Sequence, residues 1–164
     1  MLKIDSLKLA VRAMILSAVF STASAYAAPT IIDANNLDEI LKLAKGFGHA
    51  VLETDGVGDP MIRGRIDGIK YGIFFYGCTD GTDCKDIQFQ TGWDGVELSL
   101  ETINRWNQEQ RYGTASIDEE GDPRLEFPVN ITFGVTSENL EDTIDWWAVT
   151  MRNFRDFVDE NSAD

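Results

Sequence analysis

The sequence has only one histidine, two cysteines and four prolines among its 164 residues. A catalytic triad or a histidine-based metal site would have to use His49, and nothing around this residue resembles a nucleophile elbow or an H-E-x-x-H motif. We therefore interpret His49 as an ordinary residue at the start of a strand. Because the Cys and His side chains are also too few for a four-ligand zinc site, we predict no catalytic residue, no metal, no cofactor and no enzymatic activity.

Basic side chains are also scarce. The chain has 14 Lys and Arg residues against 28 Asp and Glu residues, which gives a formal net charge of −14. Proteins that bind nucleic acid or anionic lipid use clustered Lys and Arg to release counterions, and this sequence has no such run. We therefore predict no binding to nucleic acid. The acidic residues are scattered along the chain, a pattern that favours solubility.

The sequence lacks an apolar run of about 20 residues, the length that crosses a membrane. Its N-terminus instead has a basic start, an uncharged stretch at 13–23 and small residues up to Ala25 and Ala27, the layout of a cleavable signal peptide. Cleavage after Ala27 would leave residues 28–164 as one periplasmic or secreted domain without stable membrane insertion; an uncleaved anchor is the alternative. The mature chain would have 11 basic and 27 acidic side chains and a formal charge of −16.

The only cysteines are Cys78 and Cys84, separated by a stretch with an Asp-Gly step that favours a turn. In an oxidising compartment such a pair most often forms a disulfide, which we predict here; a redox-active pair is the alternative, although the spacing is wider than C-x-x-C. Asp80, Asp83 and Asp86 do not match the spacing of an EF-hand loop. We interpret these three as a solvated hairpin tip, with a calcium site as the alternative.

Hydrophobic periodicity predicts an α+β domain of element order αββββαββα. Asn36 begins a capping-box pattern for a first helix that Gly46 would end, and Ser99 is the expected N-cap of a second helix running to about Arg111. The expected strands are residues 50–54, 61–66, 69–78, 87–91, 114–117 and 124–131. The first four form an antiparallel meander because their links are too short for crossovers. Pro128 indicates an edge strand or an outward-facing backbone position.

The last expected helix begins at Thr136 or Ser137 and has the clearest pattern in the chain. Its apolar residues follow one another at alternating steps of four and three, namely Leu140, Ile144, Trp147, Met151, Phe154 and Val158. This stripe must be buried, and Trp146, Val149 and Phe157 widen it on one side. We expect the stripe to pack on the sheet and the widened side to be available for a homodimer or a partner.

The second expected helix places aromatic and amide groups side by side. Trp106 follows Ile103 by three residues and so shares its face, which favours core packing, with contact to a ligand as the alternative. Asn107 and Arg111 are one turn apart and could bond the neighbouring backbone. Our candidate binding surface consists of Trp106, Asn107, Arg111, Trp146 and Phe157.

Several segments resemble the YbjN-domain family of bacteria. They are the strand-cysteine-strand segment from Ile69 through Cys78 and Cys84 to Phe89, the I-N-R-W-N helix at 103–107 with Arg111, the acidic turn at 118–122 and the Trp-rich last helix. The likeness covers residues 36–158. It implies an antiparallel sheet with helices on one side, similar to type III secretion chaperones, and a role as a sensory transduction regulator. It implies no catalytic residues, and many members of the family stay cytoplasmic.

These observations favour an exported, non-enzymatic protein with a chaperone-like or regulatory role that binds a protein or peptide in the cell envelope. A homodimer of this chain is one option for its assembly. A periplasmic small-ligand sensor is the alternative, with Trp106, Tyr71 and Phe89 lining a pocket. The third hypothesis is a small hydrolase, which would need two buried carboxylates, or His49 with an acid, in one cleft.

Overall fold

The structure, a computed structural model, describes residues 28–162, and it confirms the predicted α+β architecture. The predicted signal peptide, with Ala25 and Ala27, lies outside these residues. The described helices are α1 (Leu37–Phe47), α2 (Leu100–Glu109) and α3 (Ser137–Asn161). The described strands are β1 (Ile31–Ile32), β2 (His49–Thr54), β3 (Pro60–Ile66), β4 (Ile69–Tyr76), β5 (Asp86–Gly92), β6 (Thr114–Ile117), β7 (Pro123–Asn130) and β8 (Val135–Thr136). No helix in this range is long and apolar enough to cross a membrane.

The main sheet has six antiparallel strands in the order β2-β3-β4-β5-β7-β6. Strands β2 to β5 form the predicted meander, and the β3–β4 hairpin turns at Asp67 and Gly68, both with positive φ. Pro128 pairs with Gln88 on β5 and lies beyond the last β6 pair, which ends at Glu126. Strand β7 is therefore an edge at Pro128, as one of the two predicted options had it. Because no described strand lies on that side of Pro128, its lack of an N–H costs the sheet no hydrogen bond.

Two strands were not predicted, so the observed order is βαββββαβββα instead of αββββαββα. Strand β1 pairs with β8 over two residues each, with Ile31 opposite Thr136 and Ile32 opposite Val135. A strand of two residues shows no alternation for a sequence pattern to reveal. This small sheet ties the start of the described chain to the start of α3.

Two helix ends differ from the predictions, while α1 begins after Asn36 as expected but without the predicted side-chain cap. The Asn36 side chain does not cap α1; its Oδ1 accepts a hydrogen bond from the Asp33 N–H instead. Helix α1 continues past Gly46 to Phe47, and a Cβ on the following Gly48 would lie 2.2 Å from the Arg65 carbonyl oxygen. Helix α2 ends at Glu109, before Arg111. The predicted Ser99 cap is confirmed, since its Oγ accepts from the Thr102 N–H at 3.0 Å.

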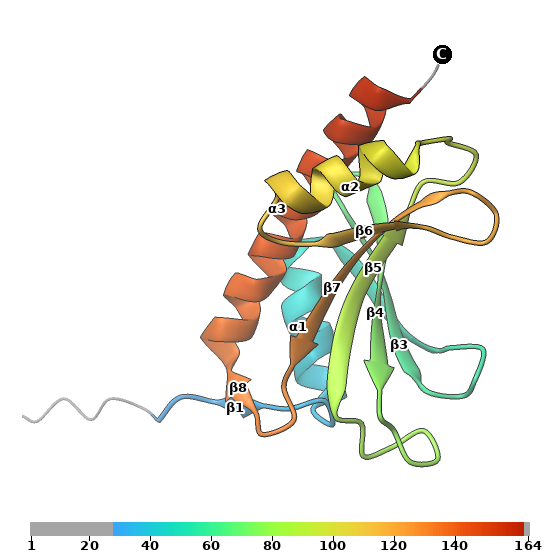
Figure 1. Cartoon of the computed structure of the whole chain (residues 1–164). Helices are drawn as coiled ribbons and strands as arrows, with labels where there is room; N and C mark the ends of the chain where they lie inside the picture. The colour runs from blue at the N-terminus through green and yellow to red at the C-terminus, as the bar shows by residue number, and fades with distance from the viewer. Residues whose placement is uncertain (1–27, 163–164) are drawn as a thin grey trace, which may run out of the picture.

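Helix α3 buries the predicted stripe. All six residues of the stripe are at most 1% exposed. They contribute to one core with inward-facing residues of the sheet, among them Ile62, Ile73, Phe75, Phe89 and Leu125. Helices α1 and α3 lie on the same side of the main sheet, while α2 lies across its end beside β6 (Figure 1). Among the described residues no helix covers the opposite face, which we call the open face.

The β4–β5 connection contains a disulfide between Cys78 and Cys84. Within its loop, Thr79 and Thr82 form an isolated antiparallel bridge, so the loop is a tight turn. Asp80 and Asp83 both have positive φ near 50°. In the described part of the chain, no group of three or more Asp, Glu, His or Cys residues is arranged to hold a metal ion, at this loop or elsewhere.

Candidate functional site

The five candidate residues lie where α2 meets α3, but they do not share one surface. Trp106 is only 2% exposed, and its ring lies 4.8 Å from that of Phe154 and 5.4 Å from that of Phe157. The Arg105 guanidinium covers Phe157 at 5.3 Å. Trp106 and Phe157 thus join α2 to α3, and Trp106 packs in the core, the role that its helical spacing favoured.

Asn107 binds the backbone of β6 through both ends of its amide. Its Nδ2 donates to the Ala115 carbonyl at 3.0 Å, and its Oδ1 accepts from the Ala115 N–H at 2.8 Å. The Trp106 Nε1–H donates to the Gly113 carbonyl at 3.1 Å. The two bonds from Asn107 satisfy the backbone N–H and carbonyl of Ala115 at the outer edge of β6, where no further described strand pairs. Together with the Trp106 bond, they hold the turn at 110–113 against α2.

That turn forms one wall of a pocket of about 320 Å³, which we call the aromatic pocket. Trp106 lies at the pocket, and Arg111 and Trp146, also among the five candidates, line it together with Gln110, Tyr112, Val149, Thr150 and Asn153. Trp146 is 44% exposed, and the sequence had assigned its side of α3 to the widened apolar surface. The structure therefore brings three of the five candidates together and adds Tyr112, which sequence reasoning missed.

The aromatic pocket combines flat apolar rings with one cation. The rings of Tyr112 and Trp146 lie 5.0 Å apart, and the Arg111 guanidinium lies 5.5 Å from the centre of the Tyr112 ring. Arg111 makes no ion pair with any described acid. An aromatic or aliphatic side chain could fill the pocket while Arg111 binds a carboxylate or a backbone carbonyl.

The three residues proposed to line a sensor pocket do not come together at a cavity. Phe89 is fully buried, 5.6 Å from the Trp147 ring, and Tyr71 packs edge-on to Trp147. Trp106 lies in a separate part of the core against Phe154. This expectation was wrong because the three residues share no pocket: Trp106 lines the aromatic pocket, Tyr71 lines a different hollow, and Phe89 is buried in the core.

His49 lies exposed at the start of β2, opposite Arg65 on β3. Within residues 28–162 it makes no hydrogen bond or ion pair with an acidic side chain. Of the two arrangements that would favour the hydrolase hypothesis, the pairing of His49 with an acid is therefore not formed among the described residues.

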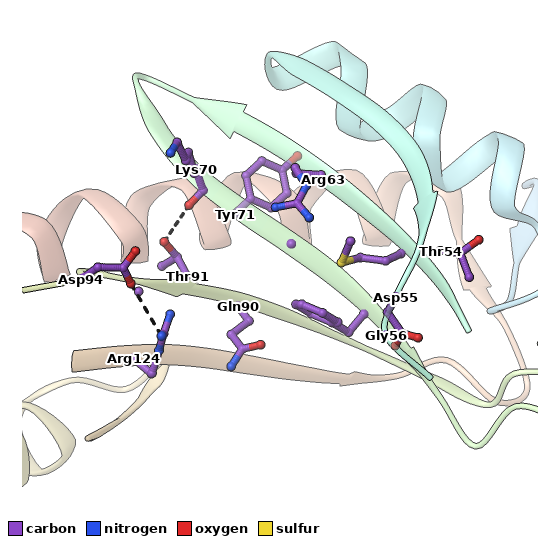
Figure 2. A pocket seen from close by; sticks show the side chains of 14 residues that line it. Thr54, Asp55, Gly56, Arg63, Lys70, Tyr71, Gln90, Thr91, Asp94 and Arg124 are labelled. Carbon is purple, nitrogen blue, oxygen red and sulfur yellow. Dashed lines mark hydrogen bonds and ion pairs between the residues drawn. The ribbon is translucent and has the colours of Figure 1, made fainter. Parts of the chain in front are cut away.

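A second and larger hollow, of about 710 Å³, lies on the open face, and we call it the sheet pocket. Figure 2 shows Lys70, Asp94 and Arg124 at one end and Thr54, Asp55 and Gly56 at the other, with Arg63 and Gln90 between them. The residues come from β2 to β5, β7 and the turns after β2 and β5. Arg63 and Arg65 alternate with the buried Ile62 and Ile66 along β3 and so lie on the open face, but this alternation carries no register that aligns them with Arg124.

The Arg124 side chain is fixed at the rim of the sheet pocket. Asp118 accepts hydrogen bonds from the Arg124 Nε at 2.7 Å and from the backbone N–H groups of Glu120 and Asp122. The bond from Asp122, followed by those from Arg124 and Glu120, lowers the pKa of Asp118 below its ordinary value against a smaller opposing effect of burial. Burial alone would lower the pKa of Arg124, but the Asp118 carboxylate raises it. The guanidinium is therefore a permanent, oriented cation.

Comparison with known proteins identifies one family. A comparison with curated proteins found no match. A family model described as "YbjN: Putative bacterial sensory transduction regulator" matches residues 36–160, which include α1, α2, all but the last residue of α3, and the whole main sheet. The match covers most of the sequence and agrees with the resemblance carried by the cysteine segment and the α2 helix. The chain belongs to the YbjN family.

Proposed function

We propose that this YbjN protein is an exported, non-enzymatic binding protein with a regulatory or chaperone-like role toward a protein or peptide partner in the cell envelope. The family description supports a regulatory role in general terms. The observation that carries the specific proposal is the aromatic pocket, where Trp146 is exposed beside Tyr112 and Arg111.

The composition of the aromatic pocket supports a protein partner over other classes. Trp, Tyr and Arg are the residues most enriched at the energetic centres of protein interfaces. Here the rings are held in place by α3 and by the turn that Trp106 and Asn107 fix, so little side-chain freedom would be lost on binding. A partner that offers an apolar side chain next to an acidic group would match both the rings and Arg111.

Crosslinking of the tagged protein in its own cell envelope, followed by mass spectrometry, tests the partner. We compare the natural protein with Trp146→Ala and with the matched control Phe133→Ala, which removes an aromatic ring that is 98% exposed at a distant turn. We expect one partner to be lost with Trp146→Ala and kept with Phe133→Ala. A partner set that is identical in all three proteins would contradict the proposal, and a self-crosslink at Trp146 would identify the partner as a second copy of the chain.

Export has its own test. If the signal peptide is removed after Ala27, N-terminal sequencing of protein from the periplasm or the medium will begin at Ala28. Protein recovered only from the cytoplasm, with its N-terminal segment intact, would contradict the export part of the proposal without affecting the binding surface.

A further inference from the structure

Basic side chains from distant parts of the sequence gather on the open face. Arg65 on β3 lies directly opposite Lys70 on β4, and both lie near Arg63. Lys70 also lines the sheet pocket together with Arg124 of β7. We call Arg63, Arg65, Lys70 and Arg124 the basic cluster. It gathers four cationic side chains, two of them in contact with Glu53, Asp94 or Asp118, on a chain whose formal net charge is −14.

Two members of the basic cluster have no acidic partner. Arg63 pairs with Glu53 at 3.0 Å, and Arg124 pairs with Asp118. Arg65 donates only to the Gly68 carbonyl, and neither Arg65 nor Lys70 makes an ion pair with a described acid. Like charges directly opposite each other on neighbouring strands destabilise a sheet, so this pair costs stability unless an anion lies over it.

Two glycines at the sheet pocket let neighbouring side chains lie close to the sheet. A Cβ on Gly92 would lie 2.2 Å from the Arg124 Nη1, and a Cβ on Gly72 would lie 2.6 Å from the Phe74 ring. Neither glycine has a positive φ, so the backbone does not itself require glycine at these places. What the glycines provide is room: the Arg124 guanidinium lies over Gly92, and the Phe74 ring lies over Gly72.

The acids at the sheet pocket leave its basic end available. Asp55 lies at the far end, and its Oδ1 already accepts three backbone N–H groups, from Val57, Gly58 and Asp59. Asp94 contacts Arg124 at 3.6 Å, but its side chain is 86% exposed and free to turn into solvent. Asp118 already holds the Arg124 Nε and Nη2, at 2.7 and 2.6 Å, so Nη1, which lies over Gly92, is the guanidinium nitrogen with no acidic contact among the described residues. An incoming anion would bind at Nη1, and it would displace only Asp94 if it also reached Nη2.

We propose that the sheet pocket binds a small organic anion, with its carboxylate or phosphate between Lys70 and the Arg124 Nη1 and its uncharged part against the Phe74 ring, toward Met61. A volume of about 710 Å³ suits a small molecule. Arg and Lys side chains bind both kinds of anionic group through charge-assisted hydrogen bonds. The surrounding excess of acidic residues repels longer polyanions, which favours a compact ligand. This site is separate from the aromatic pocket, and it would give the regulator an input distinct from its partner.

Nuclear magnetic resonance titration tests the site with defined probes. The ¹⁵N-labelled mature protein is titrated with sodium succinate, inorganic phosphate or a hexaglutamate peptide, each against sodium chloride of equal ionic strength. We expect succinate or phosphate to shift the backbone amide signals of Lys70, Gly72 and Gly92 with saturation, and the stronger of the two identifies the anionic group. Shifts that match the chloride control for both small anions would overturn the proposal. A response to hexaglutamate alone would also overturn it, in favour of an acidic peptide.

Three variants locate the binding. Lys70→Gln removes one charge-assisted contact and should weaken binding of the responding anion about tenfold, whereas Lys45→Gln, an exposed lysine on α1, should leave binding unchanged. Asp94→Asn removes the competing carboxylate and should strengthen binding. Equal affinity in all three variants would place the anion elsewhere and contradict the proposal. Because Asp94 and Lys70 are exposed, neither change should prevent folding. Both variants should keep the same crosslinked partners at the aromatic pocket as the natural protein.

Discussion

Replacing Asn107 with alanine tests whether this side chain belongs to the fold or to a binding surface. The change removes two hydrogen bonds, at 3.0 and 2.8 Å, and leaves the Ala115 N–H and carbonyl without their partner at the outer edge of β6. Ala115 is only 4% exposed, so solvent replaces these bonds poorly. With a net value of about 1 kcal/mol for each bond and a further cost for a poorly solvated N–H, the free energy of unfolding should fall by about 2–3 kcal/mol.

Urea unfolding followed by tryptophan fluorescence measures this loss. The matched control is Asn104→Ala, the same substitution on the same helix at an exposed position whose side chain makes no hydrogen bond among the described residues. Asn104→Ala should change the stability by no more than about 0.5 kcal/mol. If the two variants unfold at the same urea concentration, the bonds from Asn107 to β6 contribute nothing, and Asn107 returns to the list of binding residues.

Three further substitutions test the core and the disulfide. Trp147→Ala should cost about 3 kcal/mol or more in urea unfolding, because the ring is fully buried against Phe89 and Tyr71; a near-neutral result would contradict its place in the core. Cys78→Ser removes the disulfide to Cys84 and should lower the melting temperature by several degrees, as expected for a disulfide that adds about 2 kcal/mol to the free energy of unfolding. An unchanged melting curve would show that the disulfide does not stabilise the fold. Tyr71→Phe removes a buried hydroxyl that has no hydrogen-bond partner, so at pH 7 it should be neutral or stabilising by up to about 1 kcal/mol. Burial raises the Tyr71 pKa to about 12, so the natural protein should lose stability as the pH rises above 10, by about 1 kcal/mol at pH 11 relative to Tyr71→Phe; parallel stability curves would contradict this.

The sequence was most informative where the local pattern was long or strong. The α3 stripe extends over several turns, and the expected strands at 61–66 and 69–78 have a two-residue link that allows only a hairpin, so both were predicted with little error. Strands β1 and β8 were missed because two residues carry no period. The end of α1 was placed at Gly46 instead of Phe47. The glycine that follows the helix is Gly48, and glycine is needed there because the backbone lies close to the Arg65 carbonyl on β3, a contact that is distant in sequence.

The candidate surfaces were predicted only in part, because they too depend on contacts between residues that are distant in sequence. The width of the apolar side of α3 indicated that Trp146 had no place in the core, but Tyr112 joins it only through the turn fixed by Asn107. The sheet pocket depends on strand register: Lys70 on β4 and Arg124 on β7 lie on either side of β5 and are far apart in sequence. No local pattern could have aligned them.

The most direct test of the proposed function is photocrosslinking from the aromatic pocket in living cells. A photoreactive phenylalanine analogue replaces Gln110 at the pocket rim in one strain and Phe133 in another. We predict that the Gln110 probe forms a discrete crosslink to one envelope protein, and that Trp146→Ala in the same chain abolishes this crosslink while the Phe133 probe forms none. Discrete crosslinks from Phe133 alone, or a Gln110 crosslink that survives Trp146→Ala, would contradict partner binding at the aromatic pocket.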